Sequence, residues 1–214
     1  MRDSLRGTTA LALIVALSIG ACGTNESKAK GGHSVAVSPS ASVEAAKDRS
    51  AGLGPRLAAI ENAIGRWRRA ANLTEVWSAA EEARNLVVGE AGPYYGDADR
   101  DGVIRGASKS GLIPGLRGED AVALPGNGDC VVRDILGGSW NEPSERWSVL
   151  DAAIKSWTPS RNTFPALPSH PQRIVGWATL ALSTNSLETA KEYGGHAQLH
   201  IDVSSKAFTQ CESG

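Results

Sequence analysis

Apolar residues recur at steps of three and four along much of the chain, which is the spacing of one face of a helix. The first stripe consists of Leu57, Ile60, Ile64, Trp67 and Ala71. A second stripe follows on a new phase, through Val76, Ala80, Ala83 and Val87. Asn72 and Glu75 have the spacing of a capping box, which predicts a helix start at this point. The pattern leaves open whether the two stripes form two helices or one bent helix.

The C-terminal half of the chain predicts further helices of the same kind. One extends from Ser144, available as its N-cap, to Trp157. The next begins after Ser169 with a proline in its first turn. The last covers residues 187–208, and its seam of mostly small residues would let a neighbouring helix approach closely. A short helix is also expected at about residues 129–136.

These elements predict an all-α fold, a four-helix-bundle-like domain of two helical hairpins with a long irregular insertion. The segments IENAIGRW (60–67) and LDAAIKSW (150–157) share Ala, Ile and Trp in register, and each would begin one hairpin. Residues 107–128 are rich in glycine and lack periodicity, which indicates a long loop. Loops of this length in compact domains are usually functional or disordered.

The N-terminal 50 residues differ from this pattern. Arg2 and Arg6 precede an apolar run that ends at Ala21, too short for a permanent membrane span and typical of a secretory signal. The sequence Ile-Gly-Ala-Cys that ends at Cys22 resembles the lipobox of bacterial lipoproteins. The resemblance implies a signal peptide at 1–21 and a lipid anchor on Cys22, on the extracytoplasmic side of the cell membrane. An ordinary signal peptide with a free Cys22 is the alternative.

Export also determines how the remaining segments are interpreted. Residues 22–50 are poor in large apolar side chains and are expected to form a flexible tether, which leaves 51–214 as the folded domain. Because oxidation is the default outside the cytoplasm, Cys130 and Cys211 are predicted to form a disulfide rather than two reduced core cysteines. Closing a loop of about 80 residues would stabilise the fold by roughly 4 kcal/mol in the chain-entropy model.

An acidic motif, GDADRDGVIRG, follows the second stripe. Asp97, Asp99 and Asp101 stand at alternate positions, from which carboxylates can converge on one hard cation, and Gly102 permits the sharp turn. Val103, at the seventh position, would contribute its backbone carbonyl. The arrangement resembles the first half of an EF-hand loop, and this resemblance implies a bound calcium ion. A solvated acidic turn is the alternative.

The second half of an EF-hand loop is absent. Ser108 occupies the twelfth position, where an EF-hand carries a bidentate glutamate. Glu119 and Asp120 are therefore expected to complete the calcium shell, with Glu90 as a further candidate, and Ile104 is expected to hold the loop against the domain. Such a calcium ion would be structural rather than regulatory, because extracellular calcium sites are filled at environmental concentrations.

A second metal site is suggested by His196 and His200, which stand four apart on one face of the last helix. The glutamate of a His-Glu-x-x-His metalloprotease motif is absent. Gly194-Gly195-His196 resembles the Gly-x-His-x-x-Glu motif of imelysin-like envelope proteins, which are helical bundles linked to iron uptake, although Leu199 replaces the glutamate. Partly buried structural histidines are the alternative.

Composition narrows the function classes. With a formal net charge of -1 and no basic face, the chain is not expected to bind nucleic acid. Nucleophile-elbow, Walker and dinucleotide motifs are absent, and no catalytic residue is predicted. The pair Glu81 and Glu82 is expected on a solvated helix face.

The sequence favours an exported, membrane-anchored calcium-binding lipoprotein with a binding or envelope-support role, acting on an unidentified envelope ligand or protein. A metal-uptake accessory protein and an envelope enzyme without a recognisable motif are the alternatives.

Overall fold

The computed structural model describes residues 52–123 and 128–213, all of which belong to one compact unit. The signal peptide predicted at 1–21, the lipid anchor at Cys22 and the tether at 22–50 lie outside the described residues.

The described residues form helices and no strand, which confirms the all-α prediction. In chain order the elements are α1 (Leu53–Arg69), α2 (Leu73–Val88), α3 (Gly128–Asp134), α4 (Pro143–Lys155), the 3-10 turn η1 (Pro159–Arg161), α5 (His170–Ser183) and α6 (Leu187–Ser213). None of these helices is both long enough and apolar enough to cross a membrane.

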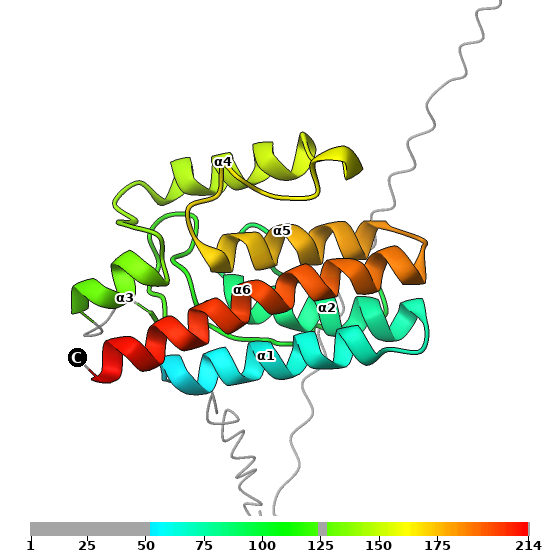
Figure 1. Ribbon diagram of the computed structural model, residues 1–214, viewed down its shortest axis with the longest axis horizontal. Coiled ribbons are helices and arrows are strands. Elements are labelled where there is room, and N and C mark those ends of the chain that lie inside the picture. Colours follow the sequence, from blue (N-terminus) through cyan, green and yellow to red (C-terminus); the bar gives the residue numbers. More distant parts are fainter. Residues whose placement is uncertain (1–51, 124–127, 214) are drawn as a thin grey trace, which may run out of the picture. The chain divides into compact units, whose positions relative to one another are not determined.

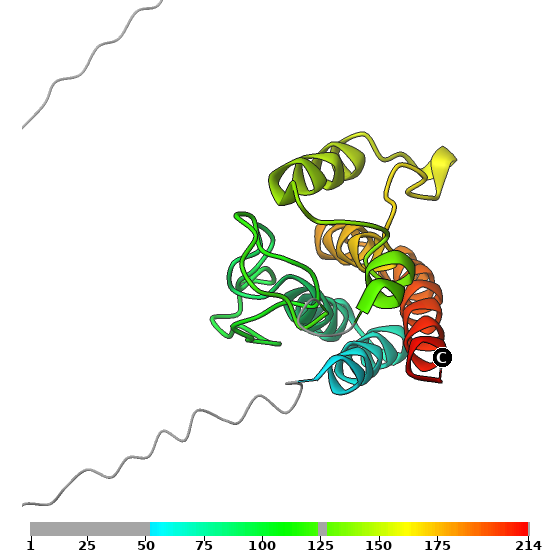
Figure 2. The same ribbon diagram turned by 90° about the vertical axis from the view of Figure 1, so that its left-hand side faces the viewer.

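Four of the helices form a closed ring around one apolar core (Figures 1 and 2). Helix α1 packs against α2 and α6, and α5 packs against the same two helices from the other side. The stripe predicted in α1 faces this core, because Leu57, Ile60, Ile64 and Trp67 are all buried. The indole of Trp67 donates to the carbonyl of Ala190 at 2.7 Å. Gly194 permits this close packing of α6, since a Cβ there would lie 3.1 Å from the Trp67 ring.

The two stripes at the start of the domain are separate helices. Helix α1 ends at Arg69 and α2 begins at Leu73, with the Asn72 side chain accepting from the backbone N–H of Glu75 at 3.0 Å. Ser169 likewise caps α5 by accepting from the N–H of Gln172 at 3.1 Å. The cap predicted at Ser144 is displaced by two residues, because the N-cap of α4 is Glu142 and the helix begins at Pro143.

Helix α4 does not belong to the ring. It lies outside, against α5, so the hairpins of the bundle are α1–α2 and α5–α6. The sequence echo between residues 60–67 and 150–157 therefore does not mark equivalent helices. Its two tryptophans differ accordingly: Trp67 is completely buried, whereas Trp157 is only partly covered.

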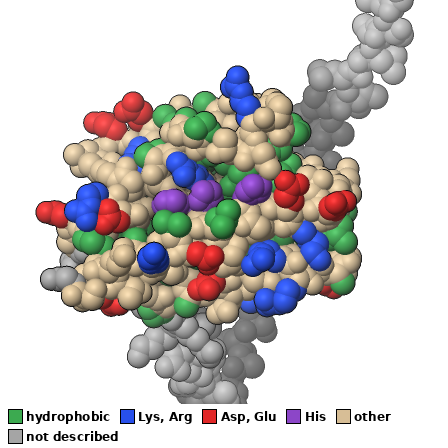
Figure 3. All heavy atoms as spheres, in the orientation of Figure 1, with side chains coloured by type: hydrophobic (Ala, Val, Ile, Leu, Met, Phe, Trp, Pro, Cys, Tyr) green, Lys and Arg blue, Asp and Glu red, His purple; other side chains and the backbone are tan. Residues whose placement is uncertain are grey.

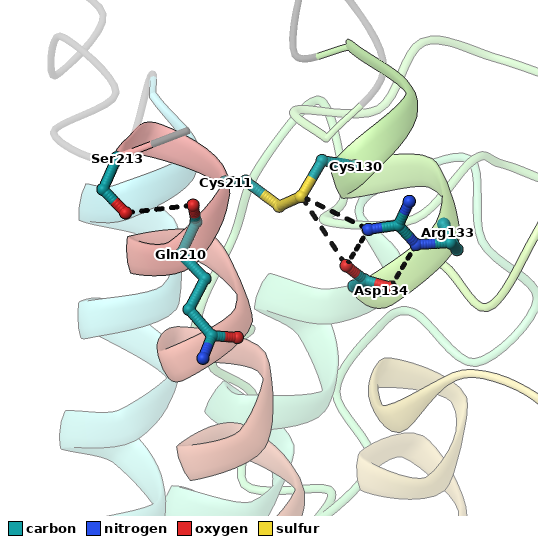
Figure 4. Close-up of a disulfide and its surroundings, with 6 residues drawn as sticks. All are labelled: Cys130, Arg133, Asp134, Gln210, Cys211 and Ser213. Carbon is teal, nitrogen blue, oxygen red and sulfur yellow. Dashed lines mark hydrogen bonds and ion pairs between the residues drawn. A yellow bond between two sulfur atoms is a disulfide. The ribbon is translucent and has the colours of Figure 1, made fainter.

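A disulfide joins the irregular middle of the chain to the bundle, as the sequence predicted (Figure 4). Cys130 on α3 bonds to Cys211 near the end of α6, with their Cα atoms 5.7 Å apart. Arg133 and Asp134 lie beside the sulfur atoms and pair with each other at 2.7 Å. The disulfide fixes α3 to the C-terminal helix.

Candidate functional site

Helix α2 carries a buried polar face, on the side covered by the irregular residues 89–123. Glu81 and Asn85, one turn apart, are both completely buried. The Asn85 side-chain amide donates to the carbonyls of Gly96 and Arg105 at 3.1 and 2.7 Å, and its oxygen accepts from the Gly96 N–H at 3.1 Å. The expectation that Glu81 lies on a solvated face is therefore wrong, because the loop covers it.

The carboxylate of Glu81 holds both ends of the acidic loop, which we define as residues 96–106. Its Oε2 accepts from the backbone N–H groups of Ala98 and Asp99, the latter at 3.1 Å. Its Oε1 accepts from the backbone N–H of Arg105 at 2.8 Å. One buried side chain thus closes the loop around the aspartates.

Within the loop, each aspartate accepts one backbone hydrogen bond. The N–H of Gly102 donates to Asp97 Oδ2 at 2.9 Å, that of Asp101 to Asp99 Oδ1 at 3.1 Å, and that of Val103 to Asp101 Oδ1 at 2.9 Å. Gly102 adopts a φ of 87°, a conformation that favours glycine, as the sequence predicted for this turn. These bonds orient the carboxylates and occupy one oxygen of each.

The remaining oxygens of two aspartates have no hydrogen-bond donor. Asp97 Oδ1 and Asp99 Oδ2 are buried and accept no hydrogen bond, and the Asp99 side chain as a whole is only 3% exposed. One carboxylate oxygen each from Glu81, Asp97 and Asp99 lie within 4.8 Å of one another. A buried acceptor without a donor is costly, so this arrangement provides oxygens that a cation could satisfy.

The charges around the cluster are partly balanced. Arg105 Nη1 binds Asp101 at 2.6 Å and lies 3.8 Å from Asp99 Oδ2. Burial lowers the pKa of Arg84, beside Glu81, to about 10, so this guanidinium is still cationic at neutral pH. Burial also raises the pKa of Asp99, and the charge of Glu81 adds to the effect. Four carboxylates against two guanidinium groups leave two negative charges in the ionised site.

The other predicted calcium ligands do not belong to this cluster of carboxylates. Asp101, within the loop, is engaged by Arg105. Val103, predicted to contribute its backbone carbonyl, is 52% exposed. Glu119 and Asp120 line a separate hollow with Glu90, and Glu119 accepts from the N–H of Arg117 at 2.9 Å. None of these three carboxylates joins the cluster; Glu81 takes the place that was expected for them.

One further expectation about the loop is corrected by its packing. Ile104 is 45% exposed and does not anchor the loop. Ser108, at the position of the missing glutamate, is buried and accepts from the Arg56 guanidinium at 2.6 Å. Arg56 lies on α1 and also donates to the carbonyl of Leu86 at 2.9 Å, so the segment after the loop is tied to the bundle through this arginine.

The histidines of the described residues gather on one face of the molecule, along α5 and α6 (Figure 3). His196 Nε2 lies 3.0 Å from the Asn162 amide and 3.8 Å from Glu192, and its ring stacks on Trp177. His200 has a different partner: its Nδ1 lies 3.0 Å from Nδ1 of His170. The sequence pairs His196 with His200, whereas the closest ring contact of His200 is with a residue on another helix.

The environment of the histidine pair favours uncharged imidazoles. Burial lowers the pKa of His200 to about 4, and the nearby charges of His170 and Arg173 act in the same direction. Burial, followed by the charge of Arg173, also lowers the pKa of His170. Neutral imidazole is the form that binds metal ions.

No family model matches this chain, and no curated protein or solved structure matches it either. The chemistry of the two clusters, one of carboxylates and one of imidazoles, is therefore the basis for inferring function.

Proposed function

We propose that the protein is a calcium-binding lipoprotein of the cell envelope, in which a structural calcium ion fixes the acidic loop to helix α2. The observation that carries this proposal is the pair of buried, donor-less oxygens, Asp97 Oδ1 and Asp99 Oδ2, beside the buried carboxylate of Glu81. Calcium is a hard cation that takes six to eight oxygen ligands, including carboxylates, carbonyls and water. Its charge also equals the excess negative charge of the site.

The ligands in this proposal come from two parts of the chain. Asp97 and Asp99 supply loop carboxylates, Glu81 supplies one from α2, and the carbonyl of Val103 and water would complete the shell. Because Glu81 already accepts backbone N–H groups from both ends of the loop, the ion would strengthen an existing closure rather than create one. Extracellular calcium modules commonly bind in the range of about 0.1 to 1 mM, which suits a structural site.

The location is supported by the N-terminal sequence alone. The lipobox-like residues that end at Cys22 support anchoring on the extracytoplasmic side of the membrane, where the domain would bind an envelope ligand or protein. Cys22→Ser should release the protein from the membrane fraction and remove its acyl label in bacterial cells. An unchanged membrane fraction and label would contradict the anchor without affecting the calcium proposal.

The calcium site is tested by titrating calcium into chelator-treated mature protein, with calorimetry and thermal unfolding as readouts. We expect one ion per chain and a melting temperature that rises with calcium. Asp97→Asn and Glu81→Gln should abolish the calcium-dependent rise, because each removes a charged ligand while preserving size. Glu82→Gln is the matched control, since Glu82 pairs with Arg66 on the surface. A melting temperature that does not change at millimolar calcium would disprove the proposal.

A further inference from the structure

A second cluster in the bundle points to a different metal chemistry. We propose that His170 and His200 form a binding site for a divalent transition-metal ion such as Zn²⁺ or Cu²⁺, held by their two Nδ1 atoms across helices α5 and α6. The site does not depend on the calcium proposal. It also differs from the His196 and His200 pair that sequence spacing suggests, because His170 is 30 residues from His200 along the chain.

The distance between the two nitrogens suits a shared metal ion. The Nδ1 atoms are 3.0 Å apart, so both cannot carry a proton without repulsion, and at least one presents a lone pair. With zinc–nitrogen bonds of 2.0–2.1 Å, two imidazoles on one ion have nitrogens ~2.9 Å apart at a right angle and ~3.3 Å apart at a tetrahedral angle. A metal ion could thus replace the shared proton with little change in the distance between the nitrogens, after a shift of tautomer and a tilt of the rings that turns both lone pairs toward the ion.

Both ligands are carried by packed helices. His170 is the first residue of α5, directly after the buried N-cap Ser169. His200 lies in the middle of α6, where the Ser204 hydroxyl donates to its carbonyl at 3.0 Å. Since α5 and α6 pack along each other in the bundle, the fold determines the positions of the two imidazole groups.

The site is open on one side. Both histidines are partly exposed, and within the described residues no acidic or cysteine ligand completes a group of three with them. The remaining coordination positions would be taken by water or by a ligand from solution, which is the arrangement of metal sites that bind or transform substrates rather than closed structural ones. Imidazole donors favour zinc, copper or nickel over calcium.

Two residues beside the histidine pair, His196 and Arg173, allow the site to be tested specifically. His196 is engaged by Asn162 and by stacking on Trp177, so it is not needed in the site. Arg173 donates its Nε–H to the Leu167 carbonyl at 3.0 Å, and its charge lowers the pKa of both histidines of the pair. The same positive charge repels a metal ion, so its removal should strengthen binding.

The experiment measures zinc binding by calorimetry and copper binding by electron paramagnetic resonance on the mature protein, in a His33→Ala background that removes the remaining histidine. We expect one ion per chain and a copper spectrum with nitrogen couplings from two imidazoles. His170→Asn and His200→Asn should each weaken binding at least ten-fold, His196→Asn should leave it unchanged, and Arg173→Gln should tighten it. Circular dichroism would verify that each variant is folded.

Other results of the same experiment would contradict the proposed site. Wild-type affinity in folded His170→Asn would overturn the site. A loss in His196→Asn as large as that in His200→Asn would assign the metal to the pair on α6 instead. Calcium titration of the same histidine variants should match the wild type, so failure of this proposal can be separated from failure of the calcium proposal.

Discussion

The helical ring and the irregular segment at 89–123 are stabilised in different ways. The ring is held by many apolar side chains, each contributing part of one continuous core. The segment joins this core through Leu112 and Ile113, whereas its acidic loop and Ser108 are held by buried polar groups: Glu81 and Asn85 from α2, and Arg56 from α1. An apolar core made of many side chains loses little stability when one of them is replaced by another of similar size. A buried polar group that loses its partner, in contrast, costs the free energy of an unsatisfied hydrogen bond. Removing one of these polar groups should therefore cost more than a conservative change in the apolar core of the ring.

The largest effect is expected where a covalent bond joins α3 to the ring. Replacing Cys130 and Cys211 together by serine should lower the free energy of unfolding by roughly 4 kcal/mol, because the disulfide closes a loop of about 80 residues. Urea unfolding of the two proteins measures the difference. Hydrogen exchange should increase first in α3, and an increase confined to α1 would contradict the view that the bond secures α3.

The next effect concerns the polar attachment of the acidic loop. Glu81→Ala removes the acceptor of three backbone N–H groups and should cost roughly 3 kcal/mol even without metal. Chemical unfolding in chelator gives this value, and Glu82→Ala, at the surface, provides the control with an expected change below about 1 kcal/mol. Equal effects of the two substitutions would show that the loop is not held through Glu81.

The smallest effect is expected in the core of the ring. Ile60→Val removes one methylene group from a completely buried side chain and should cost about 1 kcal/mol. Thermal or urea unfolding measures it, with calcium binding unchanged. A loss larger than that of Glu81→Ala would reverse the comparison, because it would make the ring the more sensitive of the two regions.

The helices were predictable because their apolar spacing is a local property. The stripe from Leu57 to Trp67, the caps at Asn72 and Ser169 and the disulfide all appear in the structure. Helix α4 was misassigned to the bundle because a stripe shows that a helix has a buried face, but not which neighbour buries it.

The residues that complete the two clusters could not be identified in this way. At 3.6 residues per turn, Glu81 and Glu82 lie roughly 130° to either side of the stripe from Val76 to Val87, so periodicity alone cannot say which of them a loop will cover. His170 meets His200 only because of the register in which α5 packs on α6. Both facts depend on tertiary contacts that leave no local signal.

The double attachment of Glu81 has a kinetic consequence. Because its two oxygens hold backbone N–H groups on both sides of the turn at Gly102, those of Asp99 and Arg105, the loop is closed before any ion arrives. A calcium ion would enter without waiting for the chain to order, and little conformational entropy would be lost on binding. Exchange should then be limited by dehydration of the ion, so calcium would equilibrate with the surroundings quickly while the protein remains folded.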